Sequence, residues 1–113
     1  MTQLPNYLRA HRKRLTLSQE EVAFLLGTQS GAKTCRYERF VRVPSLETAL
    51  AYEVIFQKPV RELFGGLYHK VEQEVADRAR ALGEKNNRRK PDRHTRSKRE
   101  VFTKIANQSR KTS

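Results

Sequence analysis

Residues 18–38, SQEEVAFLLGTQSGAKTCRYE, contain two helix-start signals separated by one glycine. Ser18 and Glu21 have the spacing of a capping box, in which each side chain accepts a hydrogen bond from the other residue's amide. Gly27 is placed to end the first helix, because glycine tolerates the positive φ of a helix C-cap. After a short polar turn, Ser30 can cap a second helix that runs to about Phe40. The stretch therefore predicts two short helices joined by a tight turn.

Helix signals continue on both sides of this stretch. The spacing of leucines predicts a short basic helix over residues 6–15. Pro44 forces a break, Ser45 caps a helix from Leu46 to about residue 57, and Pro59 opens a short helix that Gly65 helps to close. The sequence thus predicts five short helices over residues 5–64, without strands, in one all-α domain spanning residues 1–66.

Residues 67–83 form a different kind of segment. Leu67, Val71, Val75, Ala79 and Leu82 recur at steps of four and three, which predicts an amphipathic helix with a narrow apolar stripe. This stripe either docks on the five-helix domain or also pairs with a second subunit. It is barely two heptads long, so it cannot specify a stable coiled coil alone.

Residues 84–113 hold 11 basic and 3 acidic side chains, a net charge of +8, whereas residues 1–83 have a net charge of +4. Their polar composition predicts a basic, flexible C-terminal tail that is largely disordered or weakly helical alone. We favour a tail that adds non-specific phosphate contacts to DNA. A segment docking on a protein partner through Phe102 and Ile105, or a merely solvated tail, are the alternatives.

The whole chain carries a net charge of +12 and has a pI near 10.5. Such a balance favours polyanionic partners, with nucleic acid first and an anionic membrane surface second. The sequence shows no apolar run long enough to cross a membrane, and we expect no membrane partner.

Catalytic and metal-binding patterns are weak in this sequence. Cys35 is the single cysteine, so it cannot form an internal disulfide or a cysteine-based zinc site, and we expect it to be a small packing residue. The three histidines, His11, His69 and His94, lack metal-ligand spacing. The sequence contains no supported catalytic arrangement and no glycine-rich phosphate loop. We therefore expect a non-enzyme in the cytoplasm, associated with the nucleoid, with no catalytic residue, cofactor or metal.

Residues 8–64 resemble the Cro and phage-repressor type of helix-turn-helix domain, often called the XRE family. The matching positions are Leu8, Arg12 and residues 17–27, 36–38, 44–50 and 60–64, in unbroken order. The resemblance covers about half of the chain and implies a five-helix, lambda-repressor-like fold. It implies that Arg12 and Glu38 form a structural ion pair, and that Gln19 touches backbone phosphate at the start of the second helix.

Residues 30–36 match the segment that reads DNA bases in that family. The chain has one residue more than usual between Gly27 and Glu38, and counting back from Glu38 places base-reading positions at Gly31, Ala32 and Arg36. Because Gly31 and Ala32 lack hydrogen-bonding side chains, base contacts are expected from Ser30, Lys33 and Arg36.

Further basic residues flank this segment. Arg39 and Arg42 follow the second helix and are expected to bind phosphate, with Lys13 as a weaker expectation. The bland alternative for each of these cations is an ordinary solvated surface.

Together these features predict a sequence-specific DNA-binding transcriptional regulator. The helix near residues 30–40 would enter the major groove of double-stranded DNA, and the chain would act as a homodimer because one helix reads few base pairs. One alternative is a protein-binding adaptor that uses the helix-turn-helix scaffold and the tail. The other is a non-specific binder of nucleic acid, including RNA.

Overall fold

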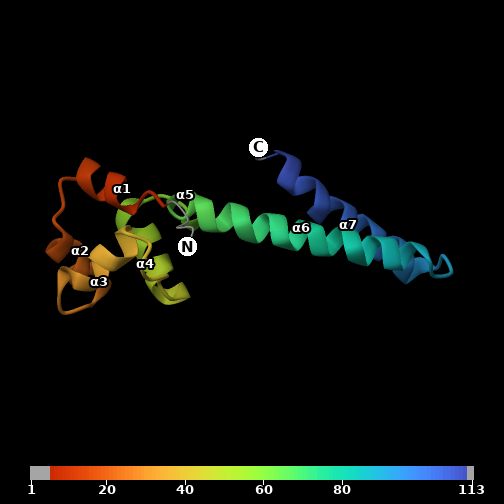
Figure 1. Cartoon of the computed structure of the whole chain (residues 1–113), viewed down its shortest axis with the longest axis horizontal. Helices are drawn as coiled ribbons and strands as arrows, with labels where there is room; N and C mark the ends of the chain where they lie inside the picture. Colours follow the sequence, from red (N-terminus) through yellow and green to blue (C-terminus); the bar gives the residue numbers. More distant parts are fainter. Residues whose placement is uncertain (1–5, 112–113) are drawn as a thin grey trace. The chain divides into compact units, whose positions relative to one another are not determined.

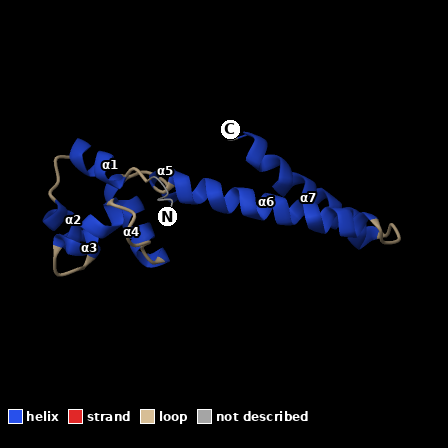
Figure 2. Ribbon diagram, viewed as in Figure 1, coloured by secondary structure: helices blue, strands red, loops and turns tan. Residues whose placement is uncertain are grey.

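The structure is a computed structural model that describes residues 6–111. Over these residues it is all-helical and contains no strand, as Figures 1 and 2 show. The helices are α1 (Leu8–Arg14), α2 (Gln19–Leu26), α3 (Gly31–Glu38), α4 (Leu46–Phe56), α5 (Val60–Leu63), α6 (Gly65–Asn87) and α7 (Arg93–Lys111). The predicted all-α class is confirmed. In the part of the chain described, no helix combines the length and apolar character that a bilayer crossing requires.

The chain divides into two compact units, Met1–Tyr68 and His69–Ser113. The sequence predicts three segments instead, 1–66, 67–83 and 84–113, of which residues 1–5 and 112–113 lie outside the described residues. The difference arises because the basic C-terminal residues form a helix that packs on α6, so both belong to one unit.

The local helix signals of the first unit are realised in the structure. The amide of Glu21 donates to Ser18 Oγ at 3.0 Å, and the amide of Ser18 donates to Glu21 Oε1 at 2.8 Å, which completes the capping box. Gly27 ends α2 with φ of 81°, a conformation that costs glycine little. Ser30 and Ser45 are the N-caps of α3 and α4.

The core of the first unit is built around an aromatic centre. The ring of Tyr52 lies 5.6 Å from Phe56, 6.1 Å from Phe64 and 6.2 Å from Tyr37, with edge-on geometry in the last two pairs. Other buried members of this core are Leu8, Val22, Ala49 and Leu63. Side chains from α1 to α5 thus meet in one core, which fixes the orientation of α3.

The second unit is a helical hairpin in which α7 runs back beside α6 (Figure 1). Gly65 does not separate α5 from a later helix but begins α6 itself. Ala76 and Ala79 are buried on α6, and Gly83 of α6 and Phe102 of α7 line one pocket near the turn. A hairpin therefore replaces the flexible tail that the composition predicts.

Polar contacts at the turn explain why this basic segment is ordered. Asn86 Nδ2 donates to the carbonyl oxygen of Thr95 at 2.9 Å, and Thr95 Oγ1 donates to the carbonyl oxygen of Lys90 at 3.2 Å. The amide of Thr95 donates to Asp92 Oδ1 at 2.8 Å, which caps the start of α7. We call Asn86, Asp92 and Thr95 the turn clasp. Asn86 and Thr95 are buried, so the clasp holds both helix ends in place.

Candidate nucleic-acid interface

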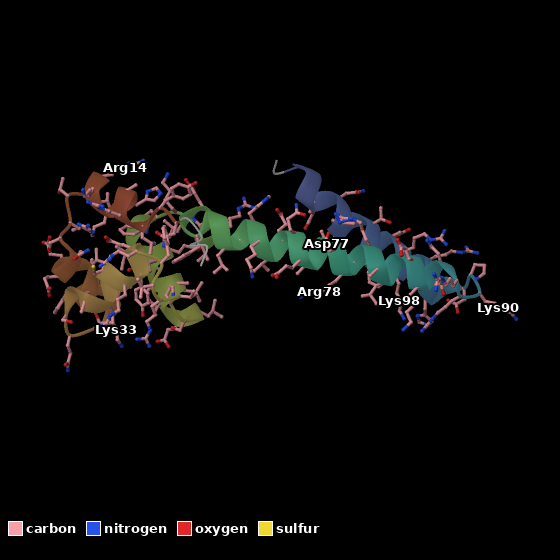
Figure 3. The ribbon with its side chains drawn as sticks, in the orientation of Figure 1. Arg14, Lys33, Asp77, Arg78, Lys90 and Lys98 are labelled. Atoms are coloured by element: carbon pink, nitrogen blue, oxygen red, sulfur yellow. The ribbon has the colours of Figure 1, made fainter. Side chains whose placement is uncertain are left out.

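Helix α3 has one buried face and one cationic face. Thr34, Tyr37 and Glu38, spaced three and four residues apart, are buried against the rest of the first unit. Lys33 and Arg36 are exposed, and Figure 3 shows Lys33 projecting away from the helices. The core therefore fixes α3 so that both cations point to solvent.

The ion pair that the sequence predicts joins α1 to α3. Arg12 Nε donates to Glu38 Oε2 at 2.6 Å and Arg12 Nη2 donates to Glu38 Oε1 at 3.1 Å, so the contact is bidentate. The side chains are only 12% and 3% exposed. The hydrogen bond to Glu38 raises the pKa of Arg12, although burial opposes this rise. Arg12 Nη1 also donates to the carbonyl oxygen of Leu17 at 3.0 Å, which ties the pair to the chain before α2.

Gln19, which the sequence predicts to touch phosphate, also makes a contact within the first unit. Its side chain is half-buried, and Nε2 donates to Glu38 Oε1 at 3.2 Å. The amide thus belongs to the Arg12–Glu38 network.

An open groove of about 590 Å³ lies between α1, the start of α2 and the end of α3. Its lining includes Arg9 and Arg39, both exposed, and the half-buried Cys35. The lining also includes the carboxylates of Glu20 and Glu38, so the groove holds charges of both signs. The sequence reasoning does not identify Arg9, because its role depends on how α1 packs beside α3.

The start of α3 depends on Glu20, another residue that the sequence reasoning misses. The amide of Gly31 donates to Glu20 Oε1 at 3.1 Å. A Cβ atom at position 31 would lie only 2.7 Å from that oxygen, so glycine permits the close approach. Because Gly31 is buried against α2, the backward count that places a base-reading position there is not supported. The signal in the sequence was a glycine in the first turn of a helix.

The other predicted contact residues lie at the two ends of α3 and beyond. Ser30 is exposed, and its Oγ accepts from the amide of Ala32 at 3.4 Å. Arg39 is the C-cap, and Arg42 lies in the loop that follows; both are exposed. The structure thus groups Ser30, Lys33, Arg36 and Arg39 on one short helix and its ends.

Lys13 lies on α1 and is also exposed. Arg14, its neighbour in the chain, projects at the opposite end of the first unit from Lys33 (Figure 3). The phosphate contact of Lys13 stays a prediction.

Two hydroxyl groups are buried beneath α3. Burial raises the pKa of Tyr52 well above its ordinary value, and the charge of Glu38 adds to this rise, whereas the nearby Thr34 hydroxyl opposes it. Among the described residues, neither Tyr52 OH nor Thr34 Oγ1 has a partner with good hydrogen-bond geometry. The two hydroxyls therefore lie near one another within the core that supports α3.

The hairpin presents a second cationic surface. Figure 3 shows Lys90 and Lys98 near its turn. The exposed cations of this region are Lys85, Arg88, Arg89, Lys90, Arg93, Arg96, Lys98 and Arg99. They outnumber the neighbouring carboxylates of Glu84, Asp92 and Glu100, and the turn clasp holds the backbone that carries them. We call these eight cations the hairpin cluster.

Within residues 6–111, no group of three or more His, Cys, Asp or Glu side chains is arranged to hold a metal ion. Comparison of the chain with known protein families, with curated proteins and with solved structures finds no significant match.

Proposed function

We propose that this chain is a sequence-specific DNA-binding transcriptional regulator of the XRE type, in which α2 and α3 form a helix-turn-helix within a five-helix domain. The observation that carries the proposal is the division of α3 into two faces. Thr34, Tyr37 and Glu38 anchor it, while Lys33 and Arg36 are left exposed. An anchored helix with outward cations is what insertion into the major groove requires.

Direct readout would depend on few side chains. Arg36 can donate two hydrogen bonds to the O6 and N7 atoms of guanine, and Lys33 can donate to the same acceptors. Ser30 lies at the start of α3, where recognition helices contact base edges. Arg39 and Arg42 would bind phosphates beside the groove.

The hairpin cluster would add affinity without sequence information. Phosphate contacts by Lys and Arg release condensed counterions, so they strengthen binding to any duplex and make it depend on salt. This addition compensates for a recognition helix with few base-reading groups.

The chain would bind as a pair of copies. One recognition helix contacts only a few base pairs, whereas two copies on a palindrome double the readout.

Selection from random duplex DNA tests the proposal. We expect the wild-type chain to enrich a palindromic motif. Lys33→Ala with Arg36→Ala should lose discrimination between this motif and unrelated duplex, while keeping the non-specific binding that the hairpin cluster supplies.

The matched control is Arg14→Ala with Arg61→Ala, which removes two exposed cations carried by α1 and α5. It should lower affinity for all duplexes to a similar small extent. Unchanged discrimination in the Lys33 and Arg36 variant would overturn the assignment of α3.

The hairpin cluster also favours a second candidate function, namely backbone-directed binding of nucleic acid. Tight, salt-sensitive binding without an enriched motif would support that function. If the chain binds no duplex even at low salt, this result would favour the alternative that the chain is a protein-binding adaptor. The next experiment would then search for a protein partner.

A further inference from the structure

A second, smaller pocket lies between α6 and α7 close to the turn of the hairpin. Its volume is about 110 Å³, and its described lining residues are Leu82, Lys85, Asn86, Arg89, Lys98 and Phe102. We call this space the hairpin pocket. The leucine and the phenylalanine are apolar, whereas the other four side chains carry N–H groups that donate hydrogen bonds. The described lining holds no carboxylate, so three cations surround one small space.

The spacing of the lining residues explains why they meet. Leu82, Lys85 and Asn86 are three and four residues apart on α6, and Lys98 and Phe102 are four residues apart on α7. Residues at these spacings share one side of a helix. The hairpin therefore places one side of each helix against the same pocket.

Asn86 is the buried polar residue of the hairpin pocket. Its side chain is only 6% exposed, and Nδ2 donates to the carbonyl oxygen of Thr95. Its own carbonyl oxygen accepts from the amide of Arg89 at 3.1 Å, so the backbone at Arg89 is held as well. The side-chain amide has a second N–H hydrogen, which can donate to a bound group. A fixed donor thus lies beside the three cations.

The cations of the hairpin pocket are not neutralised by neighbouring carboxylates. No ion pair among the described residues uses Lys85, Arg89 or Lys98. Like charges around one small space repel one another, and an anion bound between them offsets that repulsion. A group with two negative charges offsets more of it than a group with one, so the pocket favours a dianion.

The size of the hairpin pocket matches a phosphate group. A water molecule occupies about 30 Å³ in the liquid, so about 110 Å³ corresponds to roughly four waters, close to the four oxygens of phosphate. A phosphate monoester carries nearly two charges and has three free acceptor oxygens. A phosphodiester of the nucleic-acid backbone carries one charge and has two ester substituents that must both leave the pocket. The donor set and the volume therefore favour a phosphate with at most one ester bond.

We propose that the hairpin pocket binds a terminal phosphate group, meaning inorganic phosphate or a phosphate with one ester bond. Lys85, Arg89 and Lys98 pair with its charge, and Asn86 donates a hydrogen bond. This inference goes beyond the proposed function, because the site selects one kind of phosphate and does not depend on base recognition by α3.

Titration of the full, ¹⁵N-labelled chain with inorganic phosphate tests the site. At a pH above the second phosphate pKa of about 6, we expect saturable shifts of the backbone amides of residues 85–89, Lys98 and Phe102. Glycerol 3-phosphate should bind about as tightly, whereas dimethyl phosphate, a diester, should bind at least about tenfold more weakly. Shifts that follow all cations without saturation, or equal binding of the diester, would overturn the proposal.

Paired variants separate the hairpin pocket from the general positive charge of the hairpin. Arg89→Gln with Lys98→Gln should raise the dissociation constant for inorganic phosphate at least about tenfold. The matched control is Arg88→Gln with Arg99→Gln, which makes the same change in net charge at neighbouring residues outside the pocket lining. Because salt screens distant charges, it should raise the constant less than about threefold. Equal effects of the two pairs would refute the site, and the wild-type titration decides the question if a variant fails to fold.

Duplex DNA identifies the source of the phosphate group. If nucleic-acid ends supply it, a short duplex with 5′-phosphate ends should bind more tightly than the same duplex with hydroxyl ends, and the Arg89, Lys98 variant should lose this difference. If end phosphorylation has no effect although inorganic phosphate binds, the ligand is a small phosphate compound. Both results support the hairpin pocket. Because the titration with inorganic phosphate contains no DNA, failure of the proposed function would leave its result interpretable.

Discussion

At Glu38, side chains from three parts of the first unit converge on one buried carboxylate. Arg12 binds it through two nitrogens, and Gln19 donates a third hydrogen bond. Glu38→Ala leaves the guanidinium of Arg12 without its partner, so we expect a loss of about 3 kcal/mol in the free energy of unfolding. Urea denaturation measures this loss.

The same variant separates a structural role from a DNA-binding role. After correction for the folded fraction, its affinity for duplex DNA should stay within about threefold of wild type, because the carboxylate is buried. A melting temperature equal to that of the wild-type chain would contradict the structural assignment.

Thr34 and Tyr52 are polar residues whose replacement, unlike that of Glu38, we do not expect to destabilise the fold. Both hydroxyls are buried without a well-formed hydrogen bond among the described residues. Replacing both by apolar groups of similar shape removes two desolvated polar atoms at once. We expect the free energy of unfolding of the Thr34→Val, Tyr52→Phe double variant to lie within about 1 kcal/mol of the wild-type value or above it. A loss of several degrees in melting temperature would show that the hydroxyls stabilise the fold.

At the scale of the helix, Asp92 makes the start of α7 sensitive to acid. The hydrogen bond from the amide of Thr95 holds the pKa of Asp92 below its ordinary value. Because the folded pKa is depressed, the stabilisation is complete above the ordinary aspartate pKa of about 4 and is lost as the pH falls through the folded value. Helicity by circular dichroism should decrease over this window.

Asp92→Asn provides the matched control for this titration. The amide side chain can cap a helix but does not titrate. The difference between the two melting curves, followed as the pH falls, should therefore isolate Asp92 from the other carboxylates. Parallel curves at every pH would exclude a role for its ionisation.

An element can be predicted from the sequence when the contacts that determine it join residues close together in the chain. The capping box and Gly27 act within a few residues, so α2 could be predicted in detail. The order in α7 could not, because Asn86 and Thr95 form a buried contact across a turn that reads as polar and basic. The exposure of Leu46, Leu50 and Val54 on α4 could not be predicted either, because their side chains are as apolar as those of core residues.

The candidate interface shows the same division. Spacing places Lys33 and Arg36 on α3, and a resemblance carried by several segments gives Arg12 and Glu38 as partners. Sequence analysis does not identify Glu20 or Arg9. Glu20 contacts α3 from α2, and Arg9 lines the groove only because of how α1 packs. The bond of Gln19 to Glu38 could not be predicted, because a position at a helix start does not reveal this partner. Its phosphate contact stays a prediction.

At the scale of the whole molecule, positive charge is divided between α3, the proposed recognition helix, and the hairpin. Arg88→Ala, Arg89→Ala and Lys90→Ala together should reduce the slope of log affinity against log salt by up to about 3, as each lost phosphate contact contributes about 0.9. The sequence preference should stay unchanged. Fluorescence anisotropy on specific and unrelated duplexes at several salt concentrations measures both quantities. An unchanged slope would show that Arg88, Arg89 and Lys90 make no contact with DNA phosphate.

The contact between Glu20 and Gly31 limits which substitutions related chains can accept at these two positions. A Cβ atom at position 31 would push against the glutamate, and a shorter residue at position 20 would leave the first amide of α3 without its acceptor. We therefore expect changes at the two positions to accompany one another. In related chains, a side chain at position 31 should accompany a smaller residue at position 20, and a single exchange at either place should be selected against until the other follows.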